Sequence, residues 1–121
     1  MVIAIPVETS EGITSVIAEH FGRAPYYAFV DVENGEIVSV KIEPNPIVEH
    51  AEGDLPNYMR EKNVDVLIVR GIGQKAIRYL NSYGIKVIRG AQGTVETVVK
   101  NFIQGKLEDT EYEPKERFHN L

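Results

Sequence analysis

The sequence predicts an α/β fold, in which helices cover both faces of a mixed five-stranded sheet. The first half holds two strand patterns separated by Asn34-Gly35, a dipeptide typical of tight hairpins, so these strands are expected to pair antiparallel. In the second half, apolar strand patterns alternate with amphipathic helix patterns, as in parallel units joined by right-handed crossovers. The chain of 121 residues is long enough for one domain with a substantial core.

Three strands and one short helix are expected in the first half. Val2–Val7 is apolar and rich in β-branched residues, which is typical of a buried strand. Residues 14–19 are compatible with a short helix that turns its valine and isoleucine inward. Residues 26–32 and 36–42 form the expected hairpin, and the second of these segments alternates polar and apolar side chains.

The second half predicts three helices and two parallel strands. Asp54 is expected to cap the first helix and Thr94 the last, because short polar side chains accept hydrogen bonds from first-turn N–H groups. Gly84 and Gly105 follow helix patterns and indicate where those helices end. In chain order, we expect a helix over 55–62, a strand over 64–69, a helix from Ile72 to Gly84, a strand over 85–88 and a helix between Thr94 and Gly105.

The last part of the chain shows no apolar period. Residues 106–121 hold five acidic and three basic side chains. We therefore expect a single α/β domain over residues 1–107, followed by a flexible tail over 108–121.

Composition excludes several classes of protein. Hydrophobic residues make up 43% and charged residues 26%, as in an ordinary globular domain. No apolar run reaches the roughly 18 residues of a membrane span. Cysteine is absent, which excludes disulfides, thiolate zinc sites, cysteine nucleophiles and clusters held by the chain's own thiolates. The net charge of −5 argues against general nucleic-acid binding. We expect a cytoplasmic protein that binds neither nucleic acid nor membrane.

Three motifs carry a family resemblance. Residues 20–26 (HFGRAPY), 71–73 (GIG) and 90–96 (GAQGTVE) resemble the dinitrogenase iron–molybdenum cofactor biosynthesis family, small domains similar to NifX, NafY and the C-terminal part of NifB. The resemblance covers residues 1–107. It implies a three-layer α/β/α ribonuclease-H-like fold with strand order 3-2-1-4-5, in which strand 2 is antiparallel to the others. It also implies binding or carriage of iron–molybdenum cofactor or its iron–sulfur precursor.

The sequence departs from this family pattern in one loop. Many relatives carry a histidine- and glycine-rich stretch where this chain has residues 47–53, which retain only His50 and Gly53. This departure argues against tight cluster binding.

The expected topology brings the chemically interesting residues to one edge of the sheet. In open α/β sheets, ligands bind outside the carboxyl ends of the strands, where strand order reverses. Here that edge combines arginines with glycine turns that precede helix N-termini, an arrangement that suits an anion. The candidate cofactor-binding residues are His20, Arg23, Arg70, Gly71, Gly73, Arg89, Gly90, Gly93 and Thr94. The candidate metal ligands are His20 and His50.

Each candidate also has a purely structural interpretation. The glycine turns are compatible with plain strand-to-helix connections, because they lack a full phosphate-binding fingerprint. Arg70 and Arg89 could pair with Glu8 or Glu43. His20 could be satisfied by the backbone, and His50 could simply be exposed on its loop.

Two functional hypotheses remain open. The first is a non-enzymatic carrier of an anionic metal cluster, loosely bound, absent from the purified protein, and passed to a partner protein. The second is a binder of a small anionic metabolite or nucleotide without metal. A nuclease is disfavoured, because two-metal chemistry needs clustered carboxylates, whereas the first strand has none before Glu8 and Asp65 lies at the wrong end of its strand. No serine lies in a nucleophile-elbow context, so we expect no enzyme activity.

Overall fold

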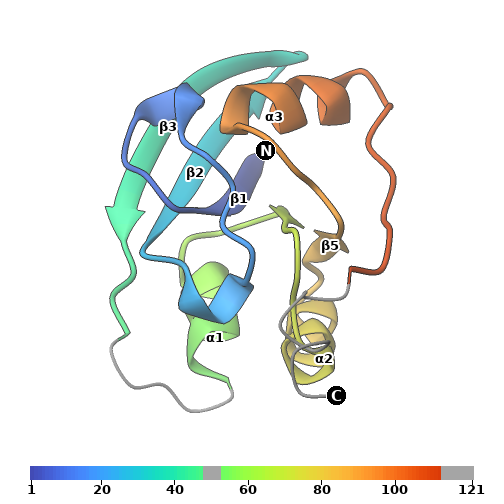
Figure 1. Ribbon diagram of the computed structural model, residues 1–121. Helices are drawn as coiled ribbons and strands as arrows, with labels where there is room; N and C mark the ends of the chain where they lie inside the picture. The colour runs from blue at the N-terminus through green and yellow to red at the C-terminus, as the bar shows by residue number, and fades with distance from the viewer. Residues whose placement is uncertain (48–52, 113–121) are drawn as a thin grey trace, which may run out of the picture.

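The computed structural model describes residues 1–47 and 53–112 (Figure 1). The five strands are β1 (Val2–Val7), β2 (Tyr26–Glu33), β3 (Glu36–Pro44), β4 (Val66–Ile68) and β5 (Lys86–Ile88). They form one sheet in the order β3-β2-β1-β4-β5. β2 pairs antiparallel with both β1 and β3, whereas β1, β4 and β5 pair parallel. The expected strand order and the antiparallel second strand are confirmed.

Helices cover both faces of this sheet. α1 (Asp54–Glu61) and α2 (Gln74–Ser82) pack on one face, and α3 (Val95–Ile103) packs on the other (Figure 1). Short 3-10 turns at Gly12–Thr14 and Phe21–Arg23 interrupt the connection from β1 to β2. No helix in the described part of the chain is long and apolar enough to cross a membrane.

The two faces of the central strand supply two separate cores. Ile3, Ile5 and Val7 of β1 are fully buried against the α3 side. Ala4 of the same strand and Leu67 of β4 are fully buried against α1 and α2. A strand covered on both faces is expected to be apolar throughout, which explains why Val2–Val7 lacks polar alternation.

The hairpin forms as its sequence predicts. Asn34 and Gly35 both have positive φ, 53° and 77°, as a two-residue turn of this hand requires. Glycines also follow the ends of α2 and α3, where Gly84 and Gly105 have φ of 78° and 72°.

The expected helix over residues 14–19 is wrong. Val16 and Ile17 are extended and form isolated bridges to Thr94 and Val7. Ile17 is buried, but Val16 is 47% exposed, so the two side chains do not share an inward face. Extended backbone suits β-branched residues, and here it lays the segment across the edge of the sheet.

The helix starts agree with the sequence in one case and differ in another. Thr94 caps α3, because its hydroxyl accepts a hydrogen bond from the Thr97 N–H. At α1 the N-cap is Gly53, and Asp54 is already the first residue of the helix. A carboxylate in the first turn still interacts favourably with the helix dipole.

Candidate functional site

The carboxyl ends of three neighbouring strands meet at one edge, and residues 15–20 tie their loops together. The Ile17 N–H donates to the Gly93 carbonyl at 2.9 Å, and the Ala18 N–H donates to the Pro6 carbonyl at 2.9 Å. His20 then forms a parallel bridge to Gly71. The loops after β1, β4 and β5 are therefore held at the same edge of the sheet.

A small cavity of about 140 Å³ lies at this edge. Its described lining consists of residues 70–74, Arg89, Glu111 and Tyr112. Arg70 lies two residues after the end of β4, and Arg89 follows β5 directly, so two parallel strands each place one arginine at this edge. α2 begins at the cavity, with Gly73 as its N-cap and no side-chain cap. Uncapped N–H groups and the dipole of a helix favour an anion at this end.

Arg70 is the least satisfied polar side chain at this edge. Its Nε atom is buried and has no hydrogen-bond partner among the described residues. The guanidinium carbon lies 4.6 Å from the centroid of the Tyr112 ring. A cation stacked on an aromatic face is stabilised, but the buried N–H still lacks an acceptor. An anionic ligand that reaches this Nε would supply that acceptor.

Arg89, in contrast, is already paired within the chain. Its Nε and Nη2 atoms each lie 3.0 Å from an oxygen of Asp109, and its backbone N–H donates to Asp109 Oδ1 at 2.7 Å. The hydrogen bond from Arg89 lowers the pKa of Asp109, and the same bond raises the pKa of Arg89. The expected alternative partners, Glu8 and Glu43, are not used; Glu43 pairs with Lys62 instead.

Two of the candidate glycines approach the chain's own C-terminal segment. A Cβ on Gly90 would lie 2.4 Å from Thr110 Oγ1, and a Cβ on Gly71 would lie 3.0 Å from Tyr112 Cδ2. Their N–H groups are also used, since they donate to the Arg70 and Glu19 carbonyls. Gly73 differs, because a Cβ there would meet nothing within 4 Å. Gly73 is therefore the candidate glycine that faces open space beside the arginines.

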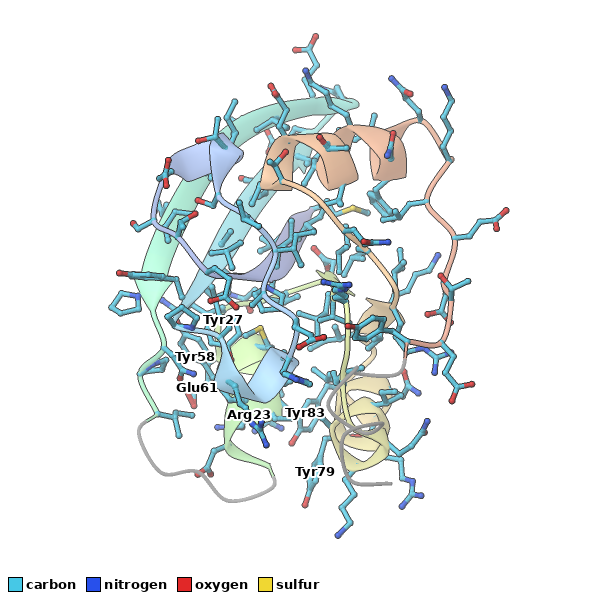
Figure 2. The ribbon with its side chains drawn as sticks, in the orientation of Figure 1. Arg23, Tyr27, Tyr58, Glu61, Tyr79 and Tyr83 are labelled. Atoms are coloured by element: carbon cyan, nitrogen blue, oxygen red, sulfur yellow. The ribbon has the colours of Figure 1, made fainter. Side chains whose placement is uncertain are left out.

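The remaining candidates lie outside the cavity lining. His20 lies beside it, with Nε2 at 3.4 Å from Glu19 Oε1. Arg23 is exposed on the turn before β2 (Figure 2). Gly93 and Thr94 join residues 16–17 at the start of α3. His50 lies outside the described residues.

The described side chains that could donate to a metal do not gather into a metal site. Residues 1–47 and 53–112 contain no group of three or more histidine, cysteine, aspartate or glutamate side chains that could hold a metal ion. The side chains at the edge instead suit the anionic periphery of a ligand, through the unpartnered Nε of Arg70 and the start of α2.

Sequence reasoning missed the residues that close the cavity. Asp109, Thr110, Glu111 and Tyr112, which we call the strap (residues 109–112), fall in the segment expected to be a flexible tail. The strap lies against the edge: Thr110 N–H donates to the Arg89 carbonyl at 3.0 Å, and Tyr112 hydrogen-bonds to Glu19. The only sequence signal was an aromatic residue within an otherwise acidic, polar stretch.

A larger hollow, of about 320 Å³, lies on the outer face of α2. Its described lining is Lys75, Arg78, Tyr79 and Ser82, of which Tyr79 is labelled in Figure 2. All four side chains are exposed and lie on one helix. This hollow has neither a buried cation nor a helix start among the residues described, so it offers less to an anion than the edge does.

Comparison with known proteins agrees with the motifs. The sequence pattern of the dinitrogenase iron–molybdenum cofactor family matches residues 1–105. The chain belongs to this family. MJ0580 of Methanocaldococcus jannaschii, an uncharacterized protein, is 30% identical over 114 residues, which is 92% of each chain. The crystal structure of PH0822 shares 40% identity with a TM-score of 0.82, covering 91% of this chain and 96% of that one.

A more distant structure shows the same fold. The apo form of the orange protein from Desulfovibrio gigas has a TM-score of 0.78 at 24% identity, covering 94% of this chain and 96% of that chain. Family membership associates the chain with iron–molybdenum cofactor biosynthesis or binding. The matched region ends at residue 105, so the strap lies beyond it.

Proposed function

We propose that this protein is a non-enzymatic binding or carrier module for an anionic metal cluster, of the iron–molybdenum cofactor or iron–sulfur precursor type. The observation that carries the proposal is the buried, unpartnered Nε of Arg70 beside the uncapped start of α2. A buried guanidinium N–H without an acceptor is unfavourable, so the site is stabilised when an anion fills it. Family membership supplies the class of anion.

The ligand would be held by charge and hydrogen bonding. Arg70 donates from Nε, and the first-turn N–H groups of α2 point toward the same end of the helix. His20, beside the cavity, is the nearest candidate for coordinating a cluster metal. Without cysteine, such a cluster is loosely bound and is passed on to a partner protein in the cytoplasm.

The arrangement does not favour catalysis. We assign the sheet order and antiparallel β2 to the ribonuclease-H-like class. Nuclease chemistry in that class needs clustered carboxylates for two metals, but β1 carries none and Asp65 lies before β4, opposite the carboxyl edge. Asp65 instead accepts a hydrogen bond from the Val2 N–H at 2.8 Å.

One observation favours a second candidate, a small anionic metabolite bound without metal. The cavity of about 140 Å³ is smaller than the roughly 300–1,000 Å³ usual for sites that take drug-sized ligands. A phosphate- or carboxylate-sized group fits that space more readily than a cluster does.

Anaerobic loading separates the two candidates. Isolated iron–molybdenum cofactor would be added to the wild type, Arg70→Gln, His20→Ala and His50→Ala, and bound iron and molybdenum measured after gel filtration. Arg78→Gln is the matched control, because it removes one positive charge from the exposed face of α2. We expect Arg70→Gln to bind roughly tenfold more weakly, since hydrogen bonds to charged groups contribute about 1.5–3 kcal/mol.

Two outcomes would contradict the proposal. Equal retention by Arg70→Gln and Arg78→Gln would remove the site from this edge. A wild type that binds no cluster but binds inorganic phosphate or a nucleotide at the same edge would establish the metal-free alternative.

A further inference from the structure

The strap closes the cavity from outside residues 1–105, the region that the family pattern matches. After α3 the chain runs down the side of the molecule, and the strap reaches the edge beside β5 and α2 (Figure 1). Thr110 sits over Gly90, and Tyr112 sits over Gly71 and Arg70. The two glycines admit this close approach, because a Cβ at either position would collide with the strap or press on it. The chain itself therefore fills part of the anion site.

The strap also brings negative charge to the arginines. Asp109 takes both Nε and Nη2 of Arg89, in the bidentate geometry that an anionic ligand would use. Glu111 lines the same cavity and acts electrostatically on Arg89. A highly charged anion entering the cavity would meet these two carboxylates, so its binding opposes the seated strap.

The ion pair that holds the strap on Arg89 is exposed to water. The Asp109 side chain is 43% exposed and its partner Arg89 is 26% exposed. Ion pairs that water can reach contribute little to stability, and each residue of the strap loses backbone entropy when it is ordered. Exposed hydrogen bonds are a feature of segments that open locally.

We propose that the strap is the wall of the anion site that determines its specificity. We also propose that the Asp109 carboxylate competes with an anionic ligand for this site, by occupying Arg89. With the strap seated, the site accepts a small tetrahedral oxyanion. A cluster-sized anion binds only when the strap is displaced, which exposes Arg89, Gly90 and the outer side of Arg70. This inference rests on the proposed function, since it concerns the size of anion that the same site takes.

The test compares a large and a small probe on full-length protein. The probes are isolated iron–molybdenum cofactor, added without oxygen, and molybdate. The strap-release variant is Asp109→Asn/Tyr112→Leu. Its matched control is Glu108→Gln/Tyr79→Leu, which removes the same charge from the exposed residue before the strap and an exposed tyrosine from α2. Hydrogen exchange of the Thr110 amide, which donates to the Arg89 carbonyl, reports directly whether the strap is seated.

We expect the strap-release variant to raise the ratio of cofactor affinity to molybdate affinity roughly tenfold over the control, because apparent affinity scales with the fraction of open protein. In the wild type, cofactor should abolish protection of the Thr110 amide and molybdate should leave it intact. The inference would be overturned if the ratio of cofactor affinity to molybdate affinity were equal in all three proteins and the Thr110 amide stayed protected with cofactor bound. That result would show that the strap does not move, and it would leave the proposed function in place. Weaker cofactor binding by the release variant would also overturn it. If no protein binds either probe, the proposed function fails and the inference with it.

Discussion

Substituting Gly90 by alanine tests whether the strap is packed on the sheet edge. Gly90 has φ of 83°, a conformation in which a non-glycine residue costs roughly 1–2 kcal/mol. The new Cβ would also lie 2.4 Å from Thr110 Oγ1 and 2.8 Å from the Thr110 carbonyl oxygen, so the strap must move. Gly84 provides the matched control, because its φ is 78° and a Cβ there would meet nothing within 4 Å.

The free energies of unfolding of the two variants should therefore differ by the net amount that the seated strap contributes to stability. The hydrogen bonds from the Thr110 N–H to the Arg89 carbonyl and from the Arg89 N–H to the Asp109 carboxylate contribute about 0.5–1.5 kcal/mol each, and ordering the strap offsets part of this. We expect Gly90→Ala to lose about 1 kcal/mol more than Gly84→Ala, which is roughly 4 °C in the melting temperature of a domain this size. Thermal denaturation and exchange of the Thr110 amide measure this. Equal melting temperatures with full Thr110 protection in Gly90→Ala would refute the packing described.

Three further predictions concern charge and packing. The hydrogen bond from Arg89 lowers the pKa of Asp109, so the contact between the strap and Arg89 is fully present above the ordinary aspartate pKa of about 3.9 and is lost as the pH falls through the lower folded value. Hydrogen exchange of the Thr110 amide should show this loss, and loss of its protection near pH 6 would contradict the prediction. The hydrogen bond from Lys62 lowers the pKa of Glu43, so Glu43→Gln should lower the free energy of unfolding at pH 7 by about 0.2–1 kcal/mol in urea titrations. This loss should shrink below pH 4, and an equal loss at both pH values would argue against the ion pair. Leu67→Ala, at a fully buried site between β4 and the α1–α2 layer, should cost about 2–5 kcal/mol by the same titration, and a loss below 1 kcal/mol would mean that this core is not packed as described.

The fold could be predicted wherever local sequence signals agree with the tertiary structure. Asn34-Gly35 specifies the hairpin by itself, because both residues adopt positive φ. The predicted helix over residues 14–19 is wrong because this segment pairs with a distant part of the chain, where Val16 forms a bridge to Thr94. A weak local helix pattern does not reveal a partner nearly eighty residues away.

The candidate site was predictable only in part, and for a topological reason. Parallel β4 and β5 place Arg70 and Arg89 at one edge, so strand directions were enough to bring these two together. The strap could not be predicted, because its positions depend on the shape of the folded edge rather than on a sequence period. Gly71 and Gly90 were read as space for a ligand, whereas the chain's own Tyr112 and Thr110 occupy that space.

The central claim is that an anion binds between Arg70 and the start of α2. The most direct measurement is an amide chemical-shift titration of the full-length protein with molybdate, repeated with Arg70→Gln and Arg78→Gln. The account predicts saturable shifts at Gly73 and Gln74, with affinity roughly tenfold lower in Arg70→Gln and little changed in Arg78→Gln. Shifts centred on Arg78 and Ser82, in the outer hollow of α2, or equal affinity in both variants, would contradict it.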